Sequence, residues 1–284
     1  MTYNKAINFE LLFTGNELLI GKVLNTNSQW LTHNITLLGG ICSRITVTRD
    51  DLKDISDTIR EILHRKPRYL IISGGLGPTY DDITLEGLSL ALNKSLCINK
   101  TAVSWITKKY NKLQKRGIVK DPEITPARIK MAKLPLNSKP LNNPIGTAPG
   151  VFLVSGKTKI FCLPGVPKEM EEIFKESVKK EITRDLKEST FVESYFTVKG
   201  VGESAMAPLI KEVGEKHSPY IYIKSHPKHG RSKVTVDFHL TTQNNAPCYN
   251  KGKKFLKRKI RKAQADLESG LKKIGGKIFY YRER

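Results

Sequence analysis

The sequence predicts an α/β fold, namely a three-layer open, mainly parallel sheet, together with a second, smaller α+β domain. Strand and helix patterns alternate through the first half of the chain, as in βαβ units. Residues 69–73 form a short, unbroken apolar run, which is typical of a parallel strand covered on both faces. After about residue 186 the alternation stops, so we place the two domains at residues 1–186 and 187–284.

The elements of the first domain follow from hydrophobic spacing and from glycine and proline positions. The predicted strands are residues 7–13, 41–48, 69–73, 151–154 and 159–163, the last two as a hairpin. Predicted helices begin near residues 26, 51, 82, 103 and 167, and 120–126 is expected to be a loop. Ligands of open α/β sheets lie beyond the carboxyl ends of the strands, so the turns at Gly15, Asp50 and Gly74 should meet at one edge.

The second domain is predicted to contain strands at 191–199, 220–224 and 233–241, with a helix at 203–216. In the third of these strands, apolar residues at 234, 236, 238 and 240 alternate with polar ones, so one face of the sheet should be solvated. A basic helix at 251–273 and a final strand at 277–281 complete the domain.

Composition excludes several classes of protein. No apolar stretch approaches the length of a bilayer span, and the N-terminus lacks the pattern of a signal peptide, so we expect a cytoplasmic protein with no membrane contact. The four cysteines are far apart and match no zinc or redox spacing. His226 and His229 resemble a metal pair but lack a third ligand, so we interpret them as surface residues.

The net charge of +22 is concentrated near the end of the chain, where the last 34 residues contain 13 basic and 3 acidic side chains. Such a tail can hold the phosphates of RNA, DNA or an anionic lipid. We favour a solvated basic surface instead, because the tail lacks aromatic residues interleaved with the charges for base stacking. Nucleic acid therefore stays a possible but unfavoured partner.

The strongest chemical signal is the string Ser-Gly-Gly-Leu-Gly-Pro-Thr-Tyr-Asp-Asp at residues 73–82. Three glycines directly after a buried strand let backbone N–H groups approach a ligand, and the following helix favours a phosphate at its positive end. Asp81 and Asp82 at the start of that helix either cap it or help to hold Mg²⁺ beside the phosphate.

Two further loops carry similar features. The segment 143–150 reads Asn-Pro-Ile-Gly-Thr-Ala-Pro-Gly. It is either a rigid loop framed by prolines or, equally, a phosphate or ribose contact made by the threonine hydroxyl between flexible glycines. Pro164 and Gly165 precede a helix, where exposed N–H groups again favour an anion. Glu169 can complement the dipole of this helix, and Arg128 and Lys130 can either neutralise phosphate or lie in solvent.

The string at 73–82 resembles the Gly-Gly-x-Gly-Pro-Thr-x-Asp-Asp motif of the molybdopterin-binding-like fold, in the version found in the CinA (competence-damage-inducible protein) family. The similarity continues through residues 14–21, 25–27, 143–150, 163–170 and 200–204, in the order of the family. The resemblance implies this fold, a nucleotide-like small-molecule substrate, a divalent metal ion (Mg, Mn or Co) and a homo-oligomer.

The resemblance also implies roles for particular residues. Asp82, Asp50 and Glu17 are expected to be catalytic, with Asp82 and Asp50 on the metal and Asp51 nearly as plausible as Asp50. The expected substrate contacts are Gly15, Gly74, Gly75, Gly77, Pro78, Thr79, Asp81, Asn143, Gly146, Thr147, Pro164 and Gly165. Bacterial members usually have aspartate where this chain has Asn16, and they carry a further deamidase domain, an activity that we expect to be absent here.

Three functions follow from these motifs. The first is a metal-dependent nucleotide pyrophosphatase that cleaves ADP-ribose or an FAD-like compound, as several members of the family do. The second is a protein of molybdenum cofactor biosynthesis that binds or adenylylates molybdopterin. The third is a non-catalytic nucleotide- or nucleic-acid-binding module that uses the basic tail.

Overall fold

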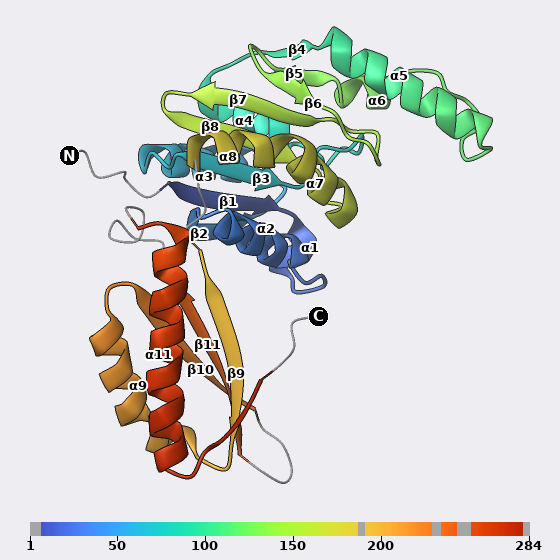
Figure 1. Cartoon of the computed structure of the whole chain (residues 1–284). Helices are drawn as coiled ribbons and strands as arrows, with labels where there is room; N and C mark the ends of the chain where they lie inside the picture. Colours follow the sequence, from blue (N-terminus) through green and yellow to red (C-terminus); the bar gives the residue numbers. More distant parts are fainter. Residues whose placement is uncertain (1–6, 187–190, 229–233, 243–250, 281–284) are drawn as a thin grey trace. The chain divides into compact units, whose positions relative to one another are not determined.

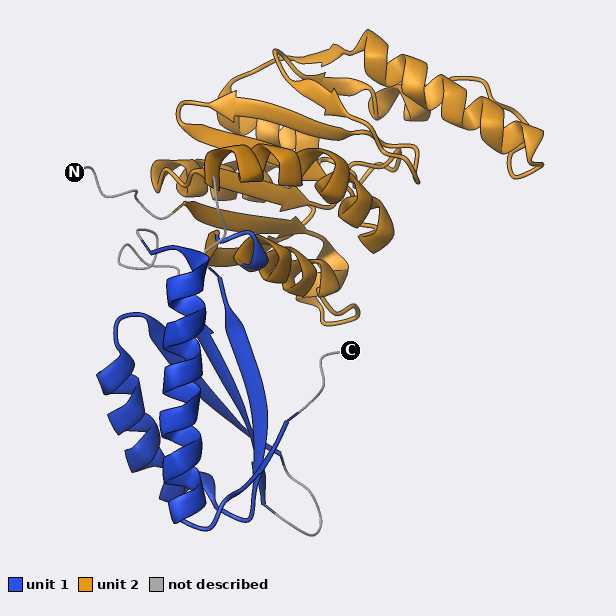
Figure 2. Ribbon diagram, viewed as in Figure 1, with its two compact units in different colours: residues 1–6, 37–39, 188–284 blue, residues 7–36, 40–187 orange. Residues whose placement is uncertain are grey.

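The computed structural model describes residues 7–186, 191–228, 234–242 and 251–280. The chain forms two compact units, which are drawn in different colours in Figure 2. One comprises residues 7–36 and 40–187, and the other contains residues 37–39 and the carboxyl-terminal part of the chain. Each unit has its own hydrophobic core.

The first unit is built on a six-stranded sheet with the order β2-β1-β3-β8-β7-β6. The first four of these strands are mutually parallel, whereas β7 runs antiparallel to both of its neighbours, β8 and the edge strand β6. The strands are β1 (Asn8–Thr14), β2 (Ile41–Thr48), β3 (Tyr69–Ser73), β6 (Lys139–Leu141), β7 (Gly150–Ser155) and β8 (Thr158–Leu163). The predicted mainly parallel sheet is confirmed (Figure 1).

Helices cover both faces of this sheet. Against one face pack α3 (Leu52–His64), α4 (Thr84–Leu92) and α5 (Lys100–Lys115), whose apolar residues share a core with Leu12, Leu70 and Ile160. The other face carries a row of aromatic rings, with Phe9 stacked on Tyr69 at 4.5 Å between centroids. Four further helical segments of this unit have buried residues that lie outside the core shared by α3, α4 and α5. They are α2 (Thr26–Leu37), α7 (Pro167–Ile173), the π-helical turn η1 (Phe174–Val178) and α8 (Lys179–Leu186).

Asp185 of α8 ties this helix to the amino ends of two central strands. Its carboxylate accepts hydrogen bonds from Arg68 at 2.8 Å, from the Tyr69 hydroxyl at 2.9 Å and from Lys159 at 3.0 Å. This charged cluster lies at the end of the sheet opposite to the glycine loops. It therefore holds the fold together without occupying the carboxyl edge.

Several short elements of this unit were not predicted from the sequence. The short helices α1 (Asn16–Leu19) and α6 (Pro126–Lys130) were not expected, and the latter begins at the end of the predicted loop. The small antiparallel sheet of β4 (Leu96–Ile98) and β5 (Lys133–Pro135) was also missed, as was the edge strand β6. All are elements of three to five residues, too short to show a hydrophobic period.

The second unit is a βαββαβ sandwich, in which two helices cover one face of an antiparallel sheet of order β10-β11-β9-β12. Val236, Phe238 and Leu240 of β11 point into the core and are fully buried, which confirms the predicted alternation at these positions, whereas Val234 precedes the strand and is 52% exposed. The elements are β9 (Glu193–Lys199), α9 (Glu203–His217), β10 (Ile221–Lys228), β11 (Thr235–Thr242), α11 (Lys253–Lys273) and β12 (Lys277–Phe279). Within the described part of the chain, no helix combines the length and apolarity needed to span a bilayer.

Candidate functional site

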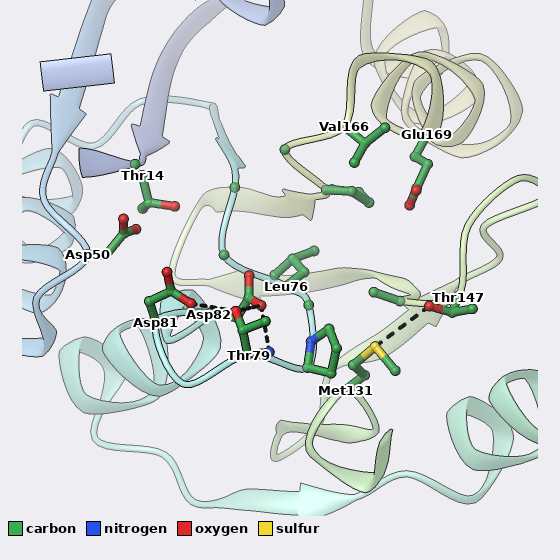
Figure 3. A pocket seen from close by; sticks show the side chains of 18 of the residues that line it. Thr14, Asp50, Leu76, Thr79, Asp81, Asp82, Met131, Thr147, Val166 and Glu169 are labelled. Carbon is green, nitrogen blue, oxygen red and sulfur yellow. Dashed lines mark hydrogen bonds between the residues drawn. The ribbon is translucent and has the colours of Figure 1, made fainter. Parts of the chain in front are cut away.

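A pocket of about 420 Å³ opens at the carboxyl ends of the parallel strands, in the size range of small-molecule sites. Its wall is formed by the loops that follow β1, β2, β3 and β8, together with the loop before β7. Figure 3 shows Asp50, Asp81 and Asp82 on one side of the pocket and Glu169 on the other. The turns at residues 15, 50 and 74 therefore meet at one edge, as the sequence predicts.

Most of the predicted site residues line this pocket. The lining residues that were predicted are Gly15, Glu17, Asp50, Gly74, Gly75, Gly77, Pro78, Thr79, Asp81, Asp82, Thr147, Pro164 and Gly165. Asn143 and Gly146 are not among the lining residues and lie behind the wall. The pocket also includes residues that were not predicted, namely Thr14, Leu76, Met131, Ala148 and Val166, and Glu169, for which we expected only a dipole role.

The glycine loop after β3 is folded so tightly that side chains would not fit. Gly74 has φ of 121°, and a Cβ atom there would lie 2.4 Å from the carbonyl oxygen of Thr14. Gly75 has φ of 60°, and its Cβ would lie 2.3 Å from the hydroxyl of Thr84. That hydroxyl lies 3.0 Å from the Thr14 hydroxyl, so the loop, β1 and α4 are locked together in a buried contact.

The two adjacent aspartates do not cap the helix. α4 begins at Thr84, its N-cap is Ile83, and no side chain caps it, because the Thr84 N–H donates to the Gly75 carbonyl. Instead, Asp82 accepts from the backbone N–H of Thr79 at 2.9 Å and lies 2.6 Å from the Thr79 hydroxyl. Asp81 contacts the same hydroxyl, which lowers the pKa of Asp81. The Thr79 hydroxyl has one proton, which it can donate to only one carboxylate at a time. The carboxylates of Asp81 and Asp82 therefore retain unused acceptor sites at the pocket wall.

Asp50 lies at the end of β2 and is half-buried. Its Oδ2 accepts from the backbone N–H of Asn16 at 2.9 Å. Burial raises the pKa of Asp50, and the negative charges of Glu17, Asp81 and Asp82 raise it further. The neighbouring Asp51 has a different environment, because its side chain accepts from two backbone N–H groups as the N-cap of α3. The structure thus places Asp50, and not Asp51, in the pocket.

Asn143 organises the loop on the opposite wall. Its side-chain amide donates to the carbonyl of Ala148 at 2.8 Å and to Glu169 at 2.7 Å, while its oxygen accepts from the N–H of Gly146 at 2.8 Å. The residue is 3% exposed, so these bonds are shielded from water. Its described contacts are thus internal to the protein and hold Glu169 at the pocket.

We expect Asn143→Ala to destabilise the protein by about 1–3 kcal/mol, because it leaves buried backbone groups and Glu169 without partners. Asn143→Asp should also destabilise it, since it removes the donors and places a second carboxylate beside Glu169. Urea denaturation of both variants measures this effect. Stability equal to that of the unmodified protein would show that the loop does not depend on this amide.

A second buried amide connects two of the pocket loops. Asn27, near the start of α2, donates to the Gly165 carbonyl at 2.8 Å and to the Ser73 hydroxyl at 3.2 Å. That hydroxyl in turn donates to the Pro164 carbonyl at 3.0 Å. The Asn-Thr-Asn segment was noted for its resemblance to the family, but no periodicity or motif chemistry indicated this positioning role.

Of the two cations considered for phosphate contact, Lys130 lies against the glycine loop and donates to the carbonyl of Thr79. Arg128 instead stacks over the Tyr110 ring, with its guanidinium carbon 3.7 Å from the ring centroid. Lys130 is therefore the cation nearer to the pocket.

The comparisons with known proteins agree with this fold. The family described as "Probable molybdopterin binding domain" matches residues 10–184, which is more than half of the chain. The chain therefore belongs to this family. CinA from Thermoplasma acidophilum, a protein of unknown function, has a crystal structure that is 39% identical in sequence, with a TM-score of 0.57, and the match covers 62% of this chain and 98% of that one.

Curated archaeal relatives match nearly the whole chain. A protein of Sulfurisphaera tokodaii is 39% identical over 272 residues, which cover 95% of this chain and 97% of the relative. A protein of Sulfolobus acidocaldarius is 41% identical over 219 residues, covering 77% and 79%. The similarity to the first of these relatives thus extends over both compact units.

Proposed function

We propose that the pocket binds a phosphate-bearing pterin or nucleotide and carries out metal-assisted chemistry at its phosphate group. One observation carries this proposal. Among the residues that the structure describes, the backbone N–H groups of Gly75, Leu76 and Gly77 have no protein acceptor, although they belong to a loop that lines the pocket. Consecutive free N–H groups in a glycine loop form a concavity that suits a phosphate.

The carboxylates fit a divalent cation that is shared with the ligand. Within the described ranges, no group of three or more acidic, histidine or cysteine side chains forms a complete metal cage. Asp50 and Asp82 nevertheless supply hard oxygen donors beside an anion loop, and Mg²⁺ is usually held by one or two carboxylates together with substrate phosphates. Burial raises the pKa of Asp50 and repulsion from the nearby carboxylates adds to this; a bound cation would relieve the repulsion, and it would neutralise charge on the phosphate.

Molybdopterin is the ligand that the family match supports, and binding or adenylylation of this pterin is therefore our first candidate. In this case the glycine loop would hold the phosphate while Asp82 and Asp50 balance its charge through the cation. Glu169, Met131 and Thr147 on the facing wall would contact the remainder of the ligand.

Hydrolysis of a pyrophosphate bond in ADP-ribose or an FAD-like compound is the second candidate. The observation that favours it is the set of four carboxylates, at residues 17, 50, 81 and 82, around a single phosphate-sized loop. Such a set suits charge stabilisation and the positioning of a water molecule, which account for most of phosphoryl-type catalysis.

A ligand panel separates the two candidates. Molybdopterin with ATP, and separately ADP-ribose, FAD, NAD and ATP, would be incubated with Mg²⁺, Mn²⁺ or Co²⁺. Metal-dependent adenylylation of molybdopterin without hydrolysis supports the first candidate, and metal-dependent release of a nucleoside monophosphate supports the second. If no compound is converted and none raises the melting temperature, the phosphate-binding proposal is wrong.

Asp50→Asn tests the cation site without an activity assay. The pKa of Asp50 in the folded protein lies above its ordinary value of about 3.9. The contribution of this carboxyl group to folding stability is therefore full at a pH below the ordinary pKa. It is lost as the pH rises through the raised pKa of the folded state. At neutral pH without metal, Asp50→Asn should therefore stabilise the protein slightly, by less than about 1 kcal/mol, because the group is partly exposed. Asparagine retains the acceptor for the Asn16 N–H.

Added metal should reverse the stability difference between the unmodified protein and Asp50→Asn. Addition of Mn²⁺ should raise the melting temperature of the unmodified protein more than that of Asp50→Asn. Asp51→Asn is the matched control, because it changes the adjacent carboxylate, which caps α3 and does not line the pocket. An equal metal response in all three proteins would exclude Asp50 as a ligand.

A further inference from the structure

The amino-terminal half of α11 carries an unusual density of positive charge. Residues 251–262 contain eight lysines and arginines and no acidic residue. The first turn of the helix has no acidic side chain either. Cations at a helix N-terminus oppose the helix dipole, and like charges four residues apart repel one another. This arrangement weakens the isolated helix, so its stability depends on packing against the sheet.

Four of these cations share one helical face. Lys254, Lys257, Arg258 and Arg261 follow the spacing i, i+3, i+4, i+7, and we call them the basic face. Together with Phe255 they line a surface depression of about 530 Å³. The opposite face of the helix is fully buried in the core of the unit through Leu256, Ile260, Ala263, Leu267 and Leu271.

Among the described residues, the basic face has no acidic partner. In the described part of the chain, none of its four cations forms an ion pair or donates a hydrogen bond to an acidic group. Further along the same helix the situation differs, because Asp266 pairs with Lys216 at 2.9 Å and with His217 at 2.8 Å. The unpaired charge is thus concentrated in the first three turns of α11.

An aromatic pair lies beside these cations. The half-buried ring of Phe255 contacts the edge of Tyr220, with 5.4 Å between centroids. Lys251 lies 5.4 Å and the Arg258 guanidinium 5.7 Å from the centroid of the Phe255 ring. The sequence reading, which found no aromatic residue among the basic ones, was wrong on this point, because Phe255 stands inside the run and Tyr220 joins it from another element.

We propose that the basic face binds single-stranded nucleic acid, with phosphates on its four cations and a base against the Phe255–Tyr220 pair. This inference goes beyond the proposed pocket function and does not depend on it. Positive grooves with aromatic rings are how proteins bind single strands without sequence preference. The span from residue 254 to 261 is about 10 Å along the helix, enough for two or three phosphates.

An anionic membrane fits the same charges less well. A helix that lies in a membrane interface inserts an apolar face opposite to its basic one. In α11 that apolar face is already buried in the protein core, and Leu256, Leu267 and Leu271 are each 0% exposed. Only Phe255 remains as an apolar contact, which is too little for insertion.

The test is a fluorescence anisotropy titration of a labelled oligouridylate with the full-length protein, at salt concentrations from about 50 to 200 mM. Two or three phosphate contacts predict a slope of about −1.4 to −2.1 for log K against log salt on a single strand. Lys257→Gln/Arg261→Gln should roughly halve the slope and lower the affinity roughly tenfold or more. Phe255→Leu should weaken binding roughly tenfold without changing the slope, since stacking is not ionic.

Lys272→Gln/Lys273→Gln is the matched control, because it removes the same charge from the last turn of the same helix. Affinity and slope unchanged by this control support a localised site. Equal losses in both double variants would overturn the proposal, as would tighter binding to a duplex than to the single strand. Binding to phosphatidylserine vesicles that survives an excess of oligouridylate would instead identify a membrane surface and also refute it.

Discussion

Asp82→Asn should lower turnover by about two orders of magnitude or more, the scale of losing one principal charge-stabilising group. The free energy of unfolding should change by no more than about 1 kcal/mol. The reason lies in the geometry, since the asparagine oxygen can still accept from the N–H of Thr79, as Asp82 does at 2.9 Å. The substitution therefore removes the charge at the pocket wall and preserves the turn.

Asp81→Asn provides the matched control for this charge. Asp81 is more exposed than Asp82, and its described hydrogen bond to another residue is with the Thr79 hydroxyl. We expect it to cost less activity, since the motif shared with the family points to the second aspartate. Turnover at saturating metal and thermal melts would be measured for both variants. A stable Asp82→Asn protein with near-normal turnover would move the catalytic role to Asp50 and Glu17.

Gly74→Ala should be the most damaging substitution to the fold of the pocket. At φ of 121° the backbone is strained for any residue with a Cβ atom, which costs about 1–3 kcal/mol. The new Cβ would also lie 2.4 Å from the Thr14 carbonyl, a backbone atom that cannot rotate away. We expect a total loss of about 3 kcal/mol or more and a melting temperature lower by roughly 10 °C.

Gly165→Ala is the control, because it changes a glycine in the same pocket without either problem. Its φ is not in the left-handed range, and the nearest atom to its Cβ would be 3.5 Å away, at Gly74 Cα. Its stability should stay within about 0.5 kcal/mol of the unmodified protein. Comparable destabilisation by the two substitutions would show that close packing at Gly74 is not what shapes the loop.

Local sequence rules predicted the larger elements well. The bounds of β2 and β3 coincide with the predicted strands, because each is a β-rich run closed by polar or glycine residues. Asp51 caps α3 as expected, and Pro167 is the first residue of α7. The antiparallel pair of β4 and β5 was missed, because segments of three residues are stabilised by their neighbours and not by their own pattern.

The candidate site was predictable where it depends on strand ends and glycine motifs, and not where it depends on tertiary contacts. The start of α4 illustrates this, since a contact with Gly75 replaces the expected aspartate cap. The same holds for Asn27 and Asn143, whose partners are up to 138 residues away in the sequence. Buried amides with distant partners leave no local signal, so only the folded chain reveals them.

The strand order also has a consequence for synthesis of the chain. β3 pairs with β1 on one side and with β8 on the other, where Ser73 lies opposite Leu163. About 90 residues must therefore be translated after β3 before its second edge is covered, which takes roughly 5–20 s at ribosomal speed. During that time a strand whose five residues are all buried in the folded protein has an unpaired edge, the kind of surface on which nascent chains associate. The central position of β8 thus delays closure of the sheet until most of the first unit has been synthesised.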